Sequence, residues 1–146
     1  MYPAPFRYHR PENLQAAVGL LTKFGDHARI MAGGQSVIPM MKLRMGEASE
    51  LVDIGRLPGL SYVKIEGNTL RIGALATHAS IAASEDGRQV HLVADAAGGI
   101  ADRQVRSMGT IGGGLSVADP SGCWPTSLSA LDAVIHVIGP QGNRSI

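Results

Sequence analysis

Long apolar runs, paired cysteines and an excess of charge of one sign are all missing from this 146-residue sequence. No apolar run approaches the roughly 20 residues that cross a bilayer, and the first residues lack the charged start and apolar core of an export signal. The 13 basic residues balance 12 acidic ones and form no stripe that would neutralise nucleic-acid phosphates. The sequence therefore predicts a cytoplasmic chain with no membrane span and no nucleic-acid partner.

Metal sites and common nucleotide signatures are also missing. The one cysteine, Cys123, excludes a disulfide within the chain, and the histidines at positions 9, 27, 78, 91 and 136 are too scattered for ligand spacing. Neither Gly-x-x-x-x-Gly-Lys nor Gly-x-Gly-x-x-Gly occurs, which disfavours kinases, ATPases and ordinary Rossmann dehydrogenases. We expect no metal ligands in this chain.

Hydrophobic periodicity predicts an α+β fold of two α/β subdomains, with a boundary near Leu57. In residues 1–57 the apolar positions 14, 17, 18 and 21 predict a helix that ends before Gly25, between strands in "FRYH" and "ARIMA". "LVDI" adds another strand, so these residues form a small β-α-β unit. Residues 58–146 are expected to form a larger mixed α+β subdomain.

That second subdomain opens with a hairpin, "YVKIEGNTLRI", which turns at Gly67 and Asn68. Helices are predicted in "HASIAAS", "HLVADAAGGIA" and "WPTSLSALDA", followed by a strand in "VIHVI". The final "RSI" begins a returning strand, and the chain stops within this predicted hairpin. We therefore expect the second subdomain to be incomplete at its C-terminus.

Two glycine-rich stretches could carry chemistry: "AGGQS" at 32–36 and "TIGGG" at 110–114. Each is predicted to be a loop whose unhindered backbone N–H groups hold a phosphate or another anion. The alternative is that both simply make turns, because a chain with 19 glycines has adjacent pairs by chance. Ser36 is expected to bond a phosphate or cap a helix, Thr77 to cap a helix, and Asp53 and Asp119 to order turns.

The two stretches together resemble a known family. "AGGQSVIPMMKLRM" resembles the N-terminal signature of the FAD-binding medium subunit of molybdenum hydroxylases, the carbon monoxide dehydrogenase and xanthine dehydrogenase family. "IADRQVRSMGTIGGGLSVADPSGCWP" is similar to that family's second signature, in the same order and at the same separation. "LVDIGRLPGL" and "IGALATH" also fall where the family has similar segments.

The resemblance implies an FAD-binding fold and an FAD site, with no catalytic acid or base on this chain. It assigns the cofactor-binding residues as Ala32, Gly33, Gly34, Gln35 and Ser36 for the pyrophosphate, Thr110, Ile111, Gly112, Gly113 and Gly114 for a second loop, and Thr77, Asp119 and Cys123 near the cofactor. Gly114 stands where the family usually has Asn, and Cys123 where it usually has Asp. The family's C-terminal domain has no counterpart in this sequence.

The resemblance also implies partners: a large molybdenum-pterin subunit and a small subunit with [2Fe-2S] clusters, in a dimer of heterotrimers. Electrons would pass from the clusters through FAD to an external acceptor. One cysteine is too few for a cluster, which takes four ligands, so the clusters must lie on another chain. Two alternatives stay open: an assembly subunit that has lost FAD, and a stand-alone flavin oxidoreductase such as a cell-wall precursor reductase.

Overall fold

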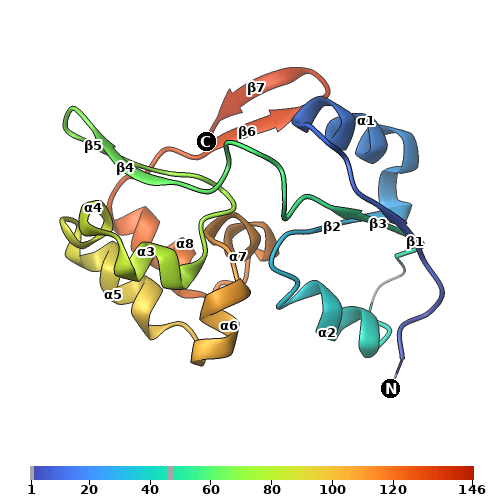
Figure 1. Ribbon diagram of the computed structural model, residues 1–146, viewed down its shortest axis with the longest axis horizontal. Coiled ribbons are helices and arrows are strands. Elements are labelled where there is room, and N and C mark those ends of the chain that lie inside the picture. Colours follow the sequence, from blue (N-terminus) through green and yellow to red (C-terminus); the bar gives the residue numbers. More distant parts are fainter. Residues whose placement is uncertain (1, 46–47) are drawn as a thin grey trace. The chain divides into compact units, whose positions relative to one another are not determined.

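The computed structural model describes residues 2–45 and 48–146, and the chain divides into two compact units (Figure 1). The first unit comprises Met1–Leu57 with Val134–Ile146, and the second comprises Pro58–Ala133. Both units contain helices and strands, which confirms the α+β class. The sequence analysis had placed residues 134–146 in the second subdomain. In the structure they group with the first unit through their backbone contacts.

The first unit is built on a parallel three-stranded sheet in the order β1-β3-β2. Its strands are β1 (Arg7–His9), β2 (Ala28–Met31) and β3 (Glu50–Asp53). The central strand β3 is the most buried, because it is paired on both edges. The strand predictions in "FRYH", "ARIMA" and "LVDI" are therefore confirmed.

Helix α1 (Leu14–Phe24) connects β1 to β2, as its apolar spacing predicts. Asn13 caps it by accepting a hydrogen bond from Ala16 N at 2.8 Å, and Gly25 ends it with φ +52°, a conformation that favours glycine. A 3₁₀ turn, Gly25–His27, and a second helix, α2 (Val37–Lys42), complete the connections. The buried apolar residues of this unit are Ala17, Ala28, Met41, Leu51, Val52 and Leu57.

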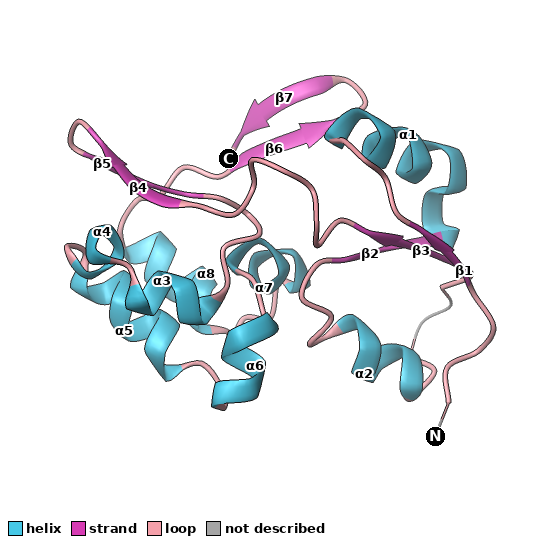
Figure 2. Cartoon of the chain, in the orientation of Figure 1, coloured by secondary structure: helices cyan, strands magenta, loops and turns pink. Residues whose placement is uncertain are grey.

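The second unit pairs a β-hairpin with a group of short helices (Figure 2). The hairpin joins β4 (Val63–Glu66) to β5 (Thr69–Ile72). The helices are α3 (His78–Ala83), α4 (Glu85–Arg88), α5 (His91–Gly99), α6 (Arg103–Met108), α7 (Ile111–Val117) and α8 (Cys123–Ala130). Their core cluster consists of Ala76, Ile81, Val93, Ala97, Ile111 and Trp124.

Part of the predicted loop at 110–114 is helical, which corrects the sequence analysis. Thr110 is the N-cap of α7, and Ile111 to Gly114 form its first turn. Three glycines in a row have low helix propensity, so the cap and the packing of this turn outweigh propensity here. Helices α2, α4 and α6 were also absent from the prediction; each has six residues or fewer, which leaves room for little periodic apolar pattern.

Within the sequence given, the two strands of the C-terminal hairpin are paired residue for residue. Strand β6 (His136–Gly139) pairs with β7 (Gly142–Ser145), and Gly142 permits the tight turn with φ +104°. Ile135 and Ile146 extend the ladder with two reciprocal backbone bonds of 2.7 and 3.0 Å. The return strand begins at Gly142, earlier than "RSI" indicates. In the described part of the chain, no helix is long and apolar enough to cross a membrane.

Candidate functional site

The first glycine-rich stretch, residues 32–36, connects β2 to α2 in the first unit. Gly34 is buried and has φ +75°, a left-handed conformation that strains any residue with a side chain. A Cβ at Gly34 would also lie 2.8 Å from Cδ1 of Ile38. The turn therefore requires glycine at this position for its own backbone geometry.

The backbone N–H groups of this turn are available to a ligand. Among the described residues, the N–H groups of Gly33, Gly34, Gln35 and Ser36 find no acceptor within the protein. Ser36 precedes α2, and its hydroxyl makes no capping bond to the described chain. Successive N–H groups in such a turn can form a concave anion site, and the anion site that the sequence analysis assigns to this stretch stays a prediction.

An apolar groove of about 270 Å³ adjoins this turn within the first unit. Met31 and Ile38 line the groove, and both also contact the position where a Cβ of Gly34 would lie. The remaining lining residues are Pro3, Phe6, Tyr8, Met41 and Leu51. The polar turn and an apolar surface therefore lie next to each other.

The second stretch, residues 110–114, differs in one respect that matters for binding: the backbone N–H groups of residues 111–114 are already bonded within the protein. Ile111 N donates to Ala76 O at 3.1 Å and Gly112 N to Ala74 O at 3.0 Å. Gly113 N donates to Thr110 Oγ1 at 3.1 Å, and Gly114 N to the Thr110 carbonyl at 3.0 Å. These four N–H groups are therefore not free to hold an anion, and the assignment of this stretch to FAD stays a prediction.

Packing explains two of the three glycines in the second stretch. A Cβ at Gly112 would lie 2.7 Å from the Ala74 carbonyl oxygen, and a Cβ at Gly114 would lie 2.8 Å from Cδ1 of Trp124. The indole thus fills the space that a side chain at position 114 would need. A Cβ at Gly113 meets only Oγ1 of Thr110, at 2.9 Å, among the residues that the structure describes. Gly113 is the glycine whose missing side chain leaves an accessible surface.

Two threonine hydroxyls lie near this turn and cap neighbouring helices. Thr77 accepts from Ser80 N at 3.1 Å, which confirms the predicted cap of α3, and Thr110 caps α7. The two threonines also pair in an isolated antiparallel bridge. A capping hydroxyl accepts one bond and keeps its own O–H to donate. Thr77 and Thr110 can therefore still donate to a phosphate or a hydroxyl oxygen.

Asp119 and Cys123 lie at the surface between α7 and α8. Oδ1 of Asp119 accepts from the backbone N–H and the hydroxyl of Ser121, at 2.9 and 2.7 Å. These bonds lower the pKa of Asp119 below its ordinary value and order the turn, as the sequence predicted. Cys123 is exposed and is the first residue of α8.

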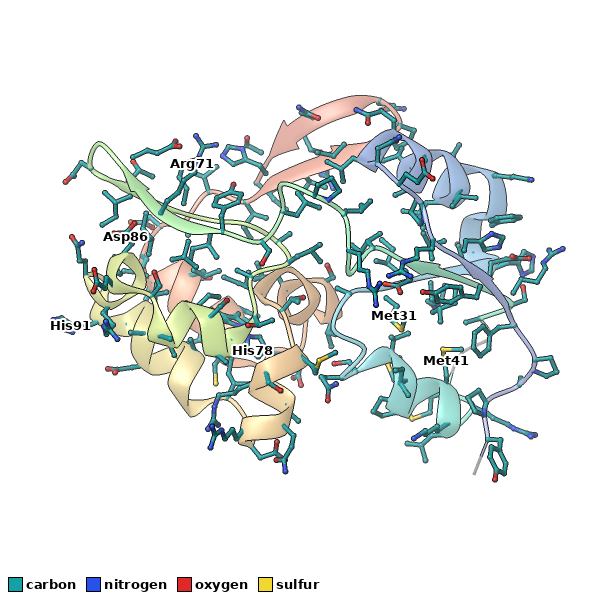
Figure 3. The ribbon with its side chains drawn as sticks, viewed as in Figure 1. Met31, Met41, Arg71, His78, Asp86 and His91 are labelled. Atoms are coloured by element: carbon teal, nitrogen blue, oxygen red, sulfur yellow. The ribbon has the colours of Figure 1, made fainter. Side chains whose placement is uncertain are left out.

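A buried histidine–tryptophan pair supports the turn, and the sequence analysis gave it no role. Trp124 Nε1 donates to His78 Nδ1 at 3.2 Å, with the ring centroids 5.8 Å apart. Burial lowers the pKa of His78, so the ring is neutral at neutral pH. Figure 3 shows His78 within the helical part of the second unit and His91 at its outer edge. The one sequence signal for this pair is that the chain has a single tryptophan, which follows the glycine-rich stretch.

A buried carboxylate stabilises the sheet of the first unit. Glu50 is only 2% exposed and is bonded by Arg7 Nε at 2.8 Å and by His9 Nε2 at 2.6 Å. The hydrogen bonds from Arg7, followed by the bond from His9, hold the pKa of Glu50 below its ordinary value. Asp53, at the end of the same strand, accepts from Gly55 N at 2.8 Å and so orders the loop that was predicted for it.

Comparison with known proteins identifies the family. Residues 4–146 match the family described as "FAD binding domain in molybdopterin dehydrogenase". All of this chain aligns, at 41% identity, with half of the 6-hydroxypseudooxynicotine dehydrogenase complex subunit alpha of Paenarthrobacter nicotinovorans. It aligns at 44% identity with 52% of the glyceraldehyde dehydrogenase medium chain of Sulfolobus acidocaldarius.

Solved structures agree with the sequence comparisons. In the carbon monoxide dehydrogenase of Hydrogenophaga pseudoflava, one chain is 40% identical and superimposes with a TM-score of 0.97, over all of this chain and 51% of that one. The chain thus spans about half the length of the relatives that it matches. Because the family match covers almost every residue, the chain belongs to the FAD-binding domain family of the molybdopterin dehydrogenases.

Proposed function

We propose that this chain binds FAD and serves as the electron-transfer flavin domain of a multi-subunit molybdenum hydroxylase. The observation that carries the proposal is the row of backbone N–H groups at residues 33–36, which have no acceptor among the described residues and lie in the family's signature stretch. A pyrophosphate needs several donors close together and little steric hindrance. The turn at Gly34 has both properties.

The two stretches have different roles in this proposal. Residues 33–36, which follow Ala32, hold the pyrophosphate through their N–H groups and the Ser36 hydroxyl. Thr77 and Thr110 donate their O–H groups to other oxygens of FAD, and Gly113 allows FAD to approach the backbone closely. Ile111, Gly112 and Gly114 shape this turn, because their N–H groups already have partners.

FAD supplies the redox chemistry when bound, and the protein contributes binding, orientation and electrostatics. Asp119 and Cys123 are at the surface and are proposed to contact FAD hydroxyls, with Asp119 offering Oδ2, since Oδ1 is used by Ser121. No residue of this chain is assigned a proton-transfer step. Bound FAD would pass electrons to an external acceptor.

The proposed partners are a large subunit with a molybdenum-pterin site and a small subunit with [2Fe-2S] clusters, in a dimer of heterotrimers. Two of the relatives are named as a medium chain and as a subunit of a dehydrogenase complex, which supports a multi-subunit assembly. The single cysteine supports clusters on a separate chain. Substrate oxidation would then take place on the large partner.

The test is to purify the protein from its native source and to measure the mass, metal content and visible spectrum of the complex. We expect a flavin spectrum together with molybdenum and iron in the same complex. A complex that contains the metals but no flavin would instead identify an assembly subunit. Flavin without molybdenum or iron would identify a stand-alone flavin oxidoreductase, and either result would overturn the proposal.

A further inference from the structure

We propose that His78 is a positioning residue for the flavin-binding turn: through Trp124 and Gly109 it fixes both ends of the segment that carries Thr110 and Gly113. The proposal rests on the proposed function, because the turn matters only if it binds FAD. His78 itself is 5% exposed and is not expected to touch the cofactor. Its effect is transmitted through two packing contacts, one at each end of residues 109–114.

The pair has a defined protonation pattern. The indole Nε1–H can only donate, so His78 Nδ1 must be the acceptor and Nε2 carries the ring proton. Trp124 is 2% exposed, so water cannot readily replace the histidine as the acceptor. The bond therefore fixes the orientation of both rings.

The histidine holds the first end of the segment. His78 N donates to Gly109 O at 3.0 Å, and a Cβ at Gly109 would lie 2.8 Å from His78 Nε2. The imidazole thus packs directly against the backbone that precedes Thr110. A change in the ring or its position must move this backbone.

The tryptophan holds the other end. A Cβ at Gly114 would lie 2.8 Å from Cδ1 of Trp124. The indole therefore packs against the backbone of the residue that follows Gly113. Thr110 and Gly113 therefore lie between the contact of His78 with Gly109 and the contact of Trp124 with Gly114. The hydrogen bond between the two rings connects these contacts. Loss of that bond leaves a buried indole N–H without an acceptor, and the rings must shift to satisfy it.

The experiment measures FAD affinity by flavin fluorescence, using the full chain stripped of flavin and then titrated with FAD. His78→Leu should weaken FAD binding about tenfold, which is about 1.4 kcal/mol. His78→Asn, which keeps an oxygen acceptor near the place of Nδ1, should bind within about threefold of wild type, since it restores the bond. His91→Leu is the matched control: His91 is exposed on α5 of the same unit, and its replacement should leave affinity unchanged.

Trp124 provides a second readout, because it is the only tryptophan and its indole N–H gives one NMR signal. The signal should be protected from hydrogen exchange in wild type and His78→Asn and lose protection in His78→Leu. If His78→Leu does not fold, Trp124→Phe tests the same bond from the donor side and should also weaken FAD binding about tenfold. The double variant should be no weaker than either single variant.

The outcomes separate the two proposals. If wild type does not bind FAD, the proposed function fails and the positioning role fails with it. If wild type binds FAD and His78→Leu and Trp124→Phe bind it equally well, only the positioning role fails. Losses that Asn does not rescue, or that add in the double variant, would also overturn the positioning role, because they would reflect general loss of packing.

Discussion

Gly113→Ala should separate stability from flavin binding, and its magnitude follows from the structure. Gly113 lies in the first turn of α7 without a positive φ, so alanine should stabilise the helix by up to about 1 kcal/mol. The new Cβ would lie 2.9 Å from Thr110 Oγ1, and displacing that hydroxyl puts at risk a cap that contributes about 1 kcal/mol. The net change without flavin therefore lies between a loss and a gain of about 1 kcal/mol, or about 3 °C in Tm in either direction.

FAD binding should weaken whichever sign the change in stability has. The added methyl occupies the accessible surface at Gly113, and we expect the Kd for FAD to rise at least about tenfold. Thermal unfolding monitored by circular dichroism gives the first quantity, and titration with FAD gives the second. Gly98→Ala is the matched control, because a Cβ at that helical glycine meets no described atom within 4 Å. Unchanged FAD affinity in Gly113→Ala would refute the assignment of this surface.

Three further changes test other parts of the structure. Gly34→Ala should cost roughly 1–2 kcal/mol in unfolding free energy, through its positive φ, and abolish tight flavin binding, whereas Gly19→Ala on α1 should leave the flavin bound. In Glu50→Gln, the Tm should fall less steeply with decreasing pH on the acid side than it does in wild type. The pKa of Glu50 is depressed in the folded state, so the stability that its charge contributes is present above the unfolded-state pKa of about 4.5 and is lost as pH falls through the lower folded-state pKa. Glu50→Gln should lack this part of the acid-induced loss of stability. Cys123→Asp should tighten FAD binding if the side chain faces the cofactor, and equal or weaker affinity in a flavin titration would show that it does not.

The elements that the sequence predicted are those with a strong local pattern. Helix α1 has apolar residues at helical spacing, a capping Asn13 and a terminal Gly25, and these signals agree with one another. The β4–β5 hairpin has alternating residues on either side of a turn at Gly67, whose φ of +61° explains the glycine. Local signals suffice in both cases because they agree with the tertiary contacts.

Helix α7 could not be predicted, because its stability comes from contacts distant in the sequence. The N–H groups of Ile111 and Gly112 are bonded to the carbonyls of Ala76 and Ala74, and Thr77 pairs with Thr110. Nothing in "TIGGG" indicates these partners, and the three glycines argue for a loop. The grouping of residues 134–146 with the first unit depends on tertiary contacts in the same way.

The hydrogen bonding of the backbone N–H groups also determines which substitutions can test FAD binding. Residues 32–36 and 110–114 look alike as glycine-rich sequences. The N–H groups of residues 33–36 have no described acceptor, whereas those of residues 111–114 are bonded within the protein. Substitutions at Gly112 or Gly114 would displace the Ala74 backbone or the Trp124 indole, so a loss of flavin there would reflect packing as readily as contact. A substitution at Gly113 meets only one hydroxyl among the described residues. Of the three glycines, Gly113 is therefore the one at which a substitution disturbs the fewest protein contacts, so a change in flavin affinity there reports most directly on the surface proposed to contact FAD.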